Sequence, residues 1–193
     1  MTRIAVFASG GGTNAENLIK NLQKGKVCIV LSDRQNAYVL ERAKKLNVPT
    51  VTFTRKELEA GGPDNRIGNI LKEYNIELII LAGFLLKIPA EMIARFPGRI
   101  INIHPALLPA FGGKGLYGHH VHKAVLEAGE KKSGITVHLV DEQYDHGKHL
   151  FQAHCTVDEN ETPETLAGKI HLLEQAHFPA VVDEYIVKHL ERV

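Results

Sequence analysis

Residues 1–103 alternate between short, continuous apolar runs and segments of helical spacing, and this alternation is what most restricts the fold. The runs that predict strands are 3–10, 26–33, 50–53, 77–84 and 99–103. The segments that predict helices are 14–25, 37–49, 64–76 and 89–98. Because the runs are apolar at consecutive positions, their strands should be buried on both faces. That pattern is typical of a parallel sheet covered by helices on both sides.

Single residues mark some of the helix boundaries. Gly25 is a typical C-cap for the first helix, and Pro89 suits the first position of the fourth. Ligands of open parallel sheets bind beyond the carboxyl ends of the strands. The residues that end each apolar run are therefore the first candidates for chemistry.

After residue 103 the pattern changes. The predicted elements are a glycine-rich loop at 112–118, a helix at 119–130, an antiparallel strand pair at 134–140 and 149–157, and a helical segment at 163–190. That last segment is one long helix or two, and Pro179 predicts a bend in it. We therefore expect an α/β fold with a mostly parallel, Rossmann-like sheet flanked by helices. An antiparallel C-terminal strand pair and a C-terminal helix should complete it.

The composition is that of one ordinary globular domain, with 193 residues, 44% apolar and 23% charged. A net charge of +1 offers no basic field for nucleic acid. Cys28 and Cys155 lie far apart and predict no disulfide framework, which favours a reducing cytoplasm. The N-terminus lacks the pattern of a signal peptide, and no apolar run is long enough to span a membrane.

The glycine loop "SGGGTNA" at 9–15 connects the first strand to the first helix. Glycines allow close backbone approach, and N–H groups at a helix start attract phosphate, so the loop predicts an anion site. A tight turn with Thr13 or Asn14 as N-cap is the simpler explanation. The spacing Gly10-x-Gly12-x-x-Ala15, with Asp33 ending the second strand, also fits a dinucleotide-binding fingerprint. An NAD-dependent oxidoreductase is therefore the main alternative.

The segment "NIHP" at 102–105 ends the fifth strand with an amide and an imidazole. Asn102 and His104 are two residues apart on an extended segment, so their side chains should point to one face. An amide can donate to a developing oxyanion, and a histidine can hold or donate a proton near neutral pH. Strand-end capping by the asparagine and a fully bonded histidine is the structural alternative.

A carboxylate to pair with this imidazole must come from elsewhere in the chain. The loop at 140–147 supplies Asp141, Glu142 and Asp145 between two predicted strands. Acidic residues are also common in turns for purely structural reasons. The loop is nevertheless the best-placed source of a carboxylate.

All 11 histidines lie at or after His104. The group that could suggest a metal cluster is His119, His120, His122, His146, His149 and His154. No cysteine pair or H-E-x-x-H pattern accompanies it, so we expect no metal. No G-x-S-x-G elbow or activated cysteine motif is present, and covalent catalysis has no visible nucleophile.

Five segments in one order resemble the folate-dependent phosphoribosylglycinamide formyltransferases. They are "FASGGGTN", "LAGFLLKIP", "INIHPALLPAF", "GITVHLVDEQYDHG" and "LLEQAHFP". The resemblance covers nearly the whole chain. It implies one formyltransferase domain over 1–193, with a phosphate-binding half at 1–103 and a folate-binding, catalytic half at 104–193.

The resemblance implies a reaction and a set of site residues. Asn102, His104 and Asp145 match the catalytic trio of the family, with Asp145 raising the pKa of His104. The residues implied for the ribonucleotide and its phosphate are Gly12, Thr13, Asn14, His171 and Glu174. The residues implied for folate are Leu85, Leu86, Lys87, Ile88, Asn102, Asp141, Glu142, Gln143, Tyr144 and Asp145.

The implied co-substrate is 10-formyltetrahydrofolate, whose formyl group passes directly to the amine of N1-(5-phosphoribosyl)glycinamide in purine (IMP) biosynthesis. The expected partners are these small molecules, with no nucleic acid and no membrane, and the protein should be a monomer or weak homodimer. The chain also departs from the family. Leu86 stands where members often carry Arg, and Arg55 is a candidate folate-side cation. The loop at 112–118 is longer than usual.

Other members of the superfamily are further alternatives. Formyltransferases that act on initiator tRNA carry an extra C-terminal RNA-binding domain, and deformylating hydrolases carry an added N-terminal domain. We expect neither here. A non-catalytic binding module is the remaining possibility, and it requires no role for His104.

Overall fold

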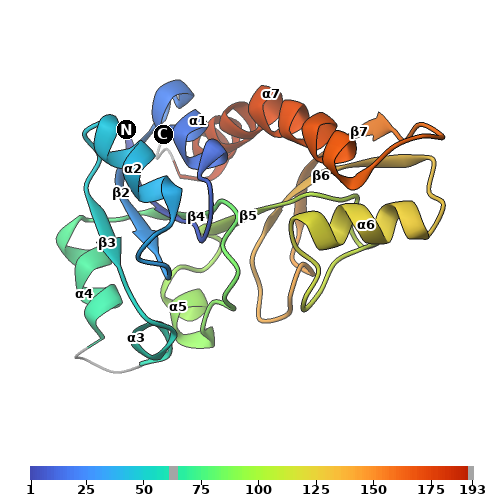
Figure 1. The fold of residues 1–193 in the computed structure, drawn as a ribbon. Coiled ribbons are helices and arrows are strands. Elements are labelled where there is room, and N and C mark those ends of the chain that lie inside the picture. Colours follow the sequence, from blue (N-terminus) through green and yellow to red (C-terminus); the bar gives the residue numbers. More distant parts are fainter. Residues whose placement is uncertain (61–64, 191–193) are drawn as a thin grey trace.

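The computed structural model describes residues 1–60 and 65–190, which form one sheet with helices on both faces (Figure 1). The strand order is β3-β2-β1-β4-β5-β6-β7. The strands are β1 Thr2–Phe7, β2 Gly25–Ser32, β3 Thr50–Thr52, β4 Leu78–Leu81, β5 Ile100–His104, β6 Lys132–Leu139 and β7 His149–Thr156. The helices are α1 Thr13–Asn21, α2 Tyr38–Lys45, α3 Arg55–Glu59, α4 Arg66–Glu73, α5 Ala90–Arg95, α6 His119–Glu127 and α7 Pro163–His189.

The pairing of the strands confirms the predicted sheet. β1 pairs in parallel with β2 and β4, β2 with β3, and β4 with β5. β5 and β6 are antiparallel, and so are β6 and β7. The carboxyl ends of β1, β4 and β5 therefore lie at one edge of the sheet.

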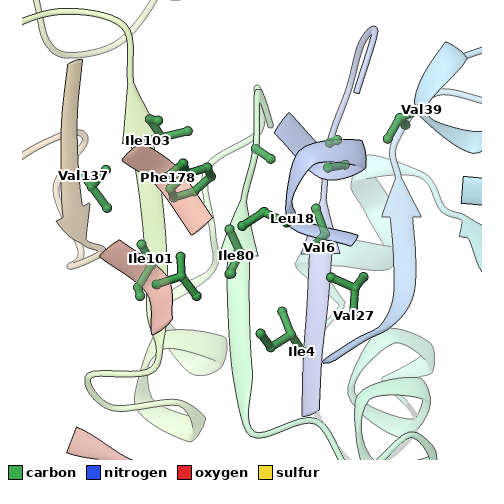
Figure 2. Close-up of a cluster of buried hydrophobic side chains, with 14 of the residues drawn as sticks. Ile4, Val6, Leu18, Val27, Val39, Ile80, Ile101, Ile103, Val137 and Phe178 are labelled. Atoms are coloured by element: carbon green, nitrogen blue, oxygen red, sulfur yellow. The ribbon is translucent and has the colours of Figure 1, made fainter. Parts of the chain in front are cut away.

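Successive residues of β1 enter two different cores, which explains the continuous apolar runs. Ile4 and Val6 belong to a core that also contains apolar residues of α1, α2, α6 and α7, whereas Ala5 and Phe7 belong to one with residues of α3, α4 and α5. Figure 2 shows the first core, in which Leu18 of α1 lies over the strands. Burial on both faces explains why consecutive residues of β1, from Ile4 to Phe7, are apolar.

The long helix α7 is a single element, and Pro179 lies inside it. Proline has no N–H, so the carbonyl of Gln175, four residues earlier, receives no backbone hydrogen bond from it. The side chain of Asn17 in α1 fills this place, because its Nδ2 donates to the Gln175 carbonyl at 3.1 Å. Asn17 is buried. The proline in α7 thus explains why a polar residue of α1 is buried.

Some predicted boundaries were wrong. Gly25 does not cap α1, because the helix ends at Asn21 with Leu22 as its C-cap. Gly25 instead opens β2, where a Cβ would lie 2.4 Å from Ile4 Cδ1. Pro89 is the N-cap of α5, one position earlier than predicted.

Helix α3 was not predicted at all, although its capping box is visible in the sequence. The Thr54 side chain accepts from the Glu57 N–H, and the Glu57 carboxylate accepts from the Thr54 N–H. The next predicted helix, 64–76, is shorter in the structure, and its residue 64 lies outside the described residues.

The bond between Asn17 and Gln175 can be tested by a double-mutant cycle with Pro179. Asn17→Ala should lower the free energy of unfolding by about 1–3 kcal/mol, because a buried carbonyl loses its donor. In a Pro179→Ala background the same change should cost less, since the alanine can supply a backbone N–H. Urea unfolding of the four proteins gives the coupling energy. Equal costs in both backgrounds would show that the bond does not compensate for the proline.

Candidate active site

A cleft of about 870 Å³ lies at the carboxyl ends of β1, β4 and β5. Much of its wall comes from residues 9–14 and 82–88, which follow β1 and β4, and from residues 103–105 at the end of β5. Every residue that the sequence analysis assigned to catalysis or binding lines this cleft, with the exception of Glu142. Glu142 is exposed and does not line the cleft, so the structure does not place it in the predicted wall of the folate pocket.

Asn102 and His104 lie on β5, and both side chains face the carboxylate of Asp145. Asn102 Nδ2 is 3.4 Å from Asp145 Oδ1, and His104 Nδ1 is 3.6 Å from Asp145 Oδ2. Their predicted position on one face of the strand is confirmed. The structure thus brings an amide and an imidazole to a carboxylate that is 43 residues from Asn102 in sequence.

Asp145 is held in place by the loop around it and by the glycine-rich loop. Its backbone is left-handed, with φ 53°, and its Oδ2 accepts a hydrogen bond from the Gly113 N–H at 2.9 Å. At Gly112 a Cβ would lie 3.1 Å from the Cβ of Asp145 and 2.6 Å from Leu108 Cδ2. A glycine at 112 therefore allows the two loops to approach each other.

The pKa of Asp145 lies below its usual range. Burial acts to raise it, but the His138 and His104 rings beside the carboxylate and the Gly113 N–H together lower it. Asp145 is therefore a carboxylate at neutral pH, and it can stabilise positive charge on either imidazole.

The pKa of His104 was predicted to be raised by Asp145, and the structure corrects this. Burial of the ring lowers its pKa and outweighs the opposing effects of the Asp145 carboxylate and the Phe111 carbonyl. Asp145 acts in the expected direction, but the net pKa lies below the ordinary value. His104 Nε2 is 2.8 Å from the Phe111 carbonyl oxygen, so both ring nitrogens face oxygen atoms.

His138 completes this group, and the sequence analysis missed it. It lies on β6 directly opposite Asn102 in the strand register. Its Nδ1 is 2.8 Å from the Leu139 carbonyl, and its Nε2 is 3.1 Å from Asn102 Nδ2 and 3.5 Å from Asp145 Oδ1. With the proton on Nδ1, the ring accepts from the Asn102 amide and fixes its orientation. The only signal in the sequence is a lone histidine within an apolar strand.

The glycine loop forms a second part of the cleft. Gly12, with φ 77°, is the N-cap of α1, so the structure does not support Thr13 or Asn14 in that role. Gly12 packs so closely on α2 that a Cβ would lie 2.4 Å from Val39 Cγ2. Asn14 is buried beside the cleft, and its Oδ1 has no hydrogen-bond partner among the described residues.

Glu174 and His171 lie on α7 at the wall of the same cleft. His171 Nδ1 is 2.9 Å from Glu174 Oε2, and this hydrogen bond raises the pKa of His171. His122 of α6 lines the cleft too. Burial lowers its pKa although Glu174 opposes the shift, and its Nδ1 has no partner within the described part of the chain.

The sequence matches the formyl transferase family over residues 2–182. This chain belongs to the formyl transferase family. The predicted resemblance and the predicted fold are both confirmed. Asp33, which a dinucleotide enzyme would use for ribose, accepts a hydrogen bond from Ser9 Oγ at 2.5 Å. Family membership favours the formyltransferase interpretation over the dinucleotide one.

Related proteins of this family share a specific name. The phosphoribosylglycinamide formyltransferase of Bacillus subtilis is 36% identical over 191 residues, which cover 96% of this chain and 95% of that protein. The chloroplastic phosphoribosylglycinamide formyltransferase of Arabidopsis thaliana is 41% identical over 174 residues, 87% of this chain. The chain spans 60% of the length of that plant relative and of the one from Vigna unguiculata.

Solved structures of the family have the same fold. The crystal structure of glycinamide ribonucleotide transformylase 1 from Symbiobacterium toebii is 33% identical, with a TM-score of 0.89. The alignment covers 100% of this chain and 91% of the Symbiobacterium toebii chain. A phosphoribosylglycinamide formyltransferase from Streptococcus pneumoniae is 36% identical, with a TM-score of 0.85 over 95% of this chain and 98% of that one.

The remaining histidines are spread over the surface of this family member. His119 Nδ1 is 3.7 Å from Glu164, and His146 Nδ1 is 2.8 Å from Asp141. Within residues 1–60 and 65–190, no group of three or more His, Cys, Asp or Glu side chains is arranged to hold a metal ion. A metal-free reaction stays a prediction.

Two cationic side chains, Arg55 and Lys87, line the cleft. Arg55 lines the cleft and is exposed, as its candidate role requires. Lys87 Nζ lies 5.8 Å from the centre of the Tyr144 ring, in a cation–π contact. Leu86 also lines the cleft and adds an apolar group to its wall.

Asp145→Asn should lower the pKa of His104 further, because the neutral amide removes the negative charge that opposes the effect of burial. The histidine ring signals in an NMR titration measure this directly. Asp141→Asn is the matched control, since that carboxylate contacts His146 instead. A pKa of His104 that does not change in Asp145→Asn would show that the 3.6 Å contact has no electrostatic effect.

His122 should make the stability of the protein depend on pH. Its pKa is lowered in the folded state, so near its ordinary pKa the unfolded chain binds more protons. At pH values above the ordinary histidine pKa, His122 therefore makes its full contribution to the free energy of unfolding. This contribution falls as the pH decreases through that value, with a slope of at most about 1.4 kcal/mol per pH unit. His122→Gln should flatten the profile from urea unfolding at several pH values. His154→Gln, at an exposed position, should leave it unchanged.

Proposed function

We propose that this chain transfers the formyl group of 10-formyltetrahydrofolate to the amine of N1-(5-phosphoribosyl)glycinamide in purine biosynthesis. The observation that carries the proposal is the meeting of Asn102, His104 and Asp145 in one cleft of a formyl transferase family member. The names of its relatives agree with this substrate.

The ribonucleotide fits the side of the cleft built by α1 and α7. Gly12, Thr13 and Asn14 offer N–H groups at a helix start, which suits the phosphate. Glu174 is a buried carboxylate at the same wall and can accept hydrogen bonds from ribose hydroxyls or from the glycine amine. Its contact with His171 orients that carboxylate.

The folate fits the other side of the cleft. Leu85, Leu86 and Ile88 offer an apolar wall for a flat heterocycle. Residues 141 and 143–145 face this wall from the hairpin loop. The formyl group of a folate held there would lie close to Asn102, between the two substrates.

The proposed reaction is a direct attack of the neutral amine on the formyl carbon. The carbonyl π electrons move to oxygen, giving a tetrahedral oxyanion, and the bond to the folate nitrogen then breaks as that nitrogen gains a proton. Asn102 and His104 donate to the oxyanion, and one such donor is worth about 3–4 kcal/mol. The oxyanion would take the place that the Phe111 carbonyl now occupies at His104 Nε2.

Asp145 has two parts in this proposal. Its charge favours a proton on His104 as the oxyanion forms, which offsets the burial that otherwise keeps this imidazole neutral. A water bound to Asp145 could carry the proton from the amine to the leaving nitrogen. Holding both substrates in line supplies much of the remaining acceleration.

The setting of the reaction is a further part of the proposal. The free thiols of Cys28 and Cys155 agree with a reducing cytoplasm. Among the described residues, every helix is too short or too polar to span a bilayer. Small-molecule partners, a monomer or weak homodimer, and the division into halves at 1–103 and 104–193 stay predictions.

A formyl-transfer assay with both substrates tests the proposal. The wild-type protein should form the N-formyl product, and His104→Ala should lower kcat by about 10²–10³ while ribonucleotide affinity changes little. His120→Ala, at an exposed histidine that does not line the cleft, is the matched control. No product from the wild-type protein, or full activity in His104→Ala, would contradict the proposed function.

Dinucleotide binding is the second candidate, because Gly10, Gly12 and Ala15 keep the fingerprint spacing and Asp33 lines the cleft. Quenching of NADH fluorescence against that of a folate analogue separates the two. Binding of NADH but not of the folate would favour an oxidoreductase.

A further inference from the structure

Helix α2 holds the glycine loop from the side opposite the cleft. The Nε of Arg42 donates to the Gly11 carbonyl at 2.8 Å, and the Val39 N–H donates to the Gly10 carbonyl at 3.1 Å. Two consecutive carbonyls of the loop are thus directed at one helix. Arg42 lies outside the cleft wall, whereas Gly10 and Gly11 are part of it.

Because the peptide bond is planar, the direction of these two carbonyls also fixes the direction of the N–H groups that follow them. In a trans peptide the C=O and the following N–H point in opposite directions. When α2 binds the carbonyls of Gly10 and Gly11, the N–H groups of Gly11 and Gly12 must point away from α2. They then lie on the same side as the free N–H groups at the start of α1, and together these donors suit an anion.

Arg42 also controls the charge beside this site. Its Nη1 contacts the carboxylate of Glu16, in the first turn of α1, and Lys20 contacts the same carboxylate. Without a cation, Glu16 would place a negative charge one turn from the proposed phosphate. The guanidinium is suited to both contacts, because it carries several donors in a fixed plane.

Asn14 gives an independent reason to expect a ligand at this place. Its side chain is nine-tenths buried at the cleft wall, and its Oδ1 has no partner among the described residues. A buried polar atom without a partner is costly, and a bound ligand or water would remove the cost. Thus the loop that Arg42 holds borders a polar group that the fold leaves unpaired.

We propose that Arg42 is a positioning residue for the substrate phosphate, since it holds the Gly11 carbonyl and thereby directs the N–H groups of the glycine loop into the cleft. It touches neither substrate. The proposal rests on the proposed function for the identity of the phosphate compound. The anion site that Arg42 organises can be measured without any formyl transfer.

Inorganic phosphate is the direct probe, measured by calorimetry and as a competitor of the ribonucleotide. Arg42→Met removes the donor and the charge but keeps an unbranched chain. It should weaken phosphate binding and raise the KM for the ribonucleotide about tenfold, the value of one charge-assisted hydrogen bond. The KM for the folate and kcat at saturation should change less than about twofold, because Arg42 acts on a binding contact shared by ground and transition states.

Three variants separate positioning from charge. Lys45→Met removes the same charge from the same helix without touching the loop, and it should bind phosphate like the wild type. Arg42→Lys keeps the charge but has a single ammonium to share between Glu16 and Gly11, and it should recover only part of the affinity. Glu16→Gln combined with Arg42→Met should remain weak if the carbonyl contact is what matters.

Several results would overturn the inference. Phosphate affinity of Arg42→Met equal to that of the wild type would do so, as would an equal loss in Lys45→Met. Full recovery in the Glu16→Gln, Arg42→Met double variant would show that Arg42 only neutralises Glu16. A wild-type protein that binds no phosphate refutes the anion site, whereas phosphate binding without formyl transfer refutes the proposed function alone.

Discussion

Parallel pairing of β1, β4 and β5 is the constraint on which the rest of the structure depends. Parallel neighbours all end at the same edge of a sheet, so three segments distant in sequence are forced to meet there. The glycine loop follows β1, the segment 83–88 follows β4, and Asn102 and His104 end β5. The pairing of the strands alone therefore brings a binding loop, an apolar wall and two polar donors together, and no contact between these segments is needed for it. These strands are buried on both faces, by one core on each side of the sheet.

The carboxylate cannot come from this parallel set, and the antiparallel part of the sheet supplies it. β6 runs back along β5, which places His138 opposite Asn102 and carries the chain away from the cleft. The hairpin loop then folds back so that Asp145 reaches both residues of β5. Gly147 makes this return possible, because a Cβ there would lie 1.9 Å from the Leu139 carbonyl oxygen. The left-handed backbone of Asp145 completes the reversal.

Sequence reasoning reached those features that depend on local pattern. The apolar runs predicted the parallel sheet, and the period of an extended strand placed Asn102 and His104 on one face. It could not find His138, since the role of a lone histidine in an apolar strand depends on the strand register. It gave the right sign for the effect of Asp145 on His104 but missed the larger effect of burial, which only the packed structure determines. Gly25 was assigned to a helix end for the same reason, because its close contact with Ile4 involves a different strand.

The proline in α7 leaves a carbonyl that ties this helix to α1, far away in sequence. Asn17 belongs to the helix that begins at the glycine loop, and the carbonyl it binds lies 158 residues later in the sequence. Phe178, which also lies in α7, covers β5 in the first core (Figure 2). During synthesis on a ribosome, the early strands and the glycine loop would emerge long before residues 163–189 leave the exit tunnel. Until then, α1 would lack its partner helix, and the cleft would lack the wall that α7 supplies.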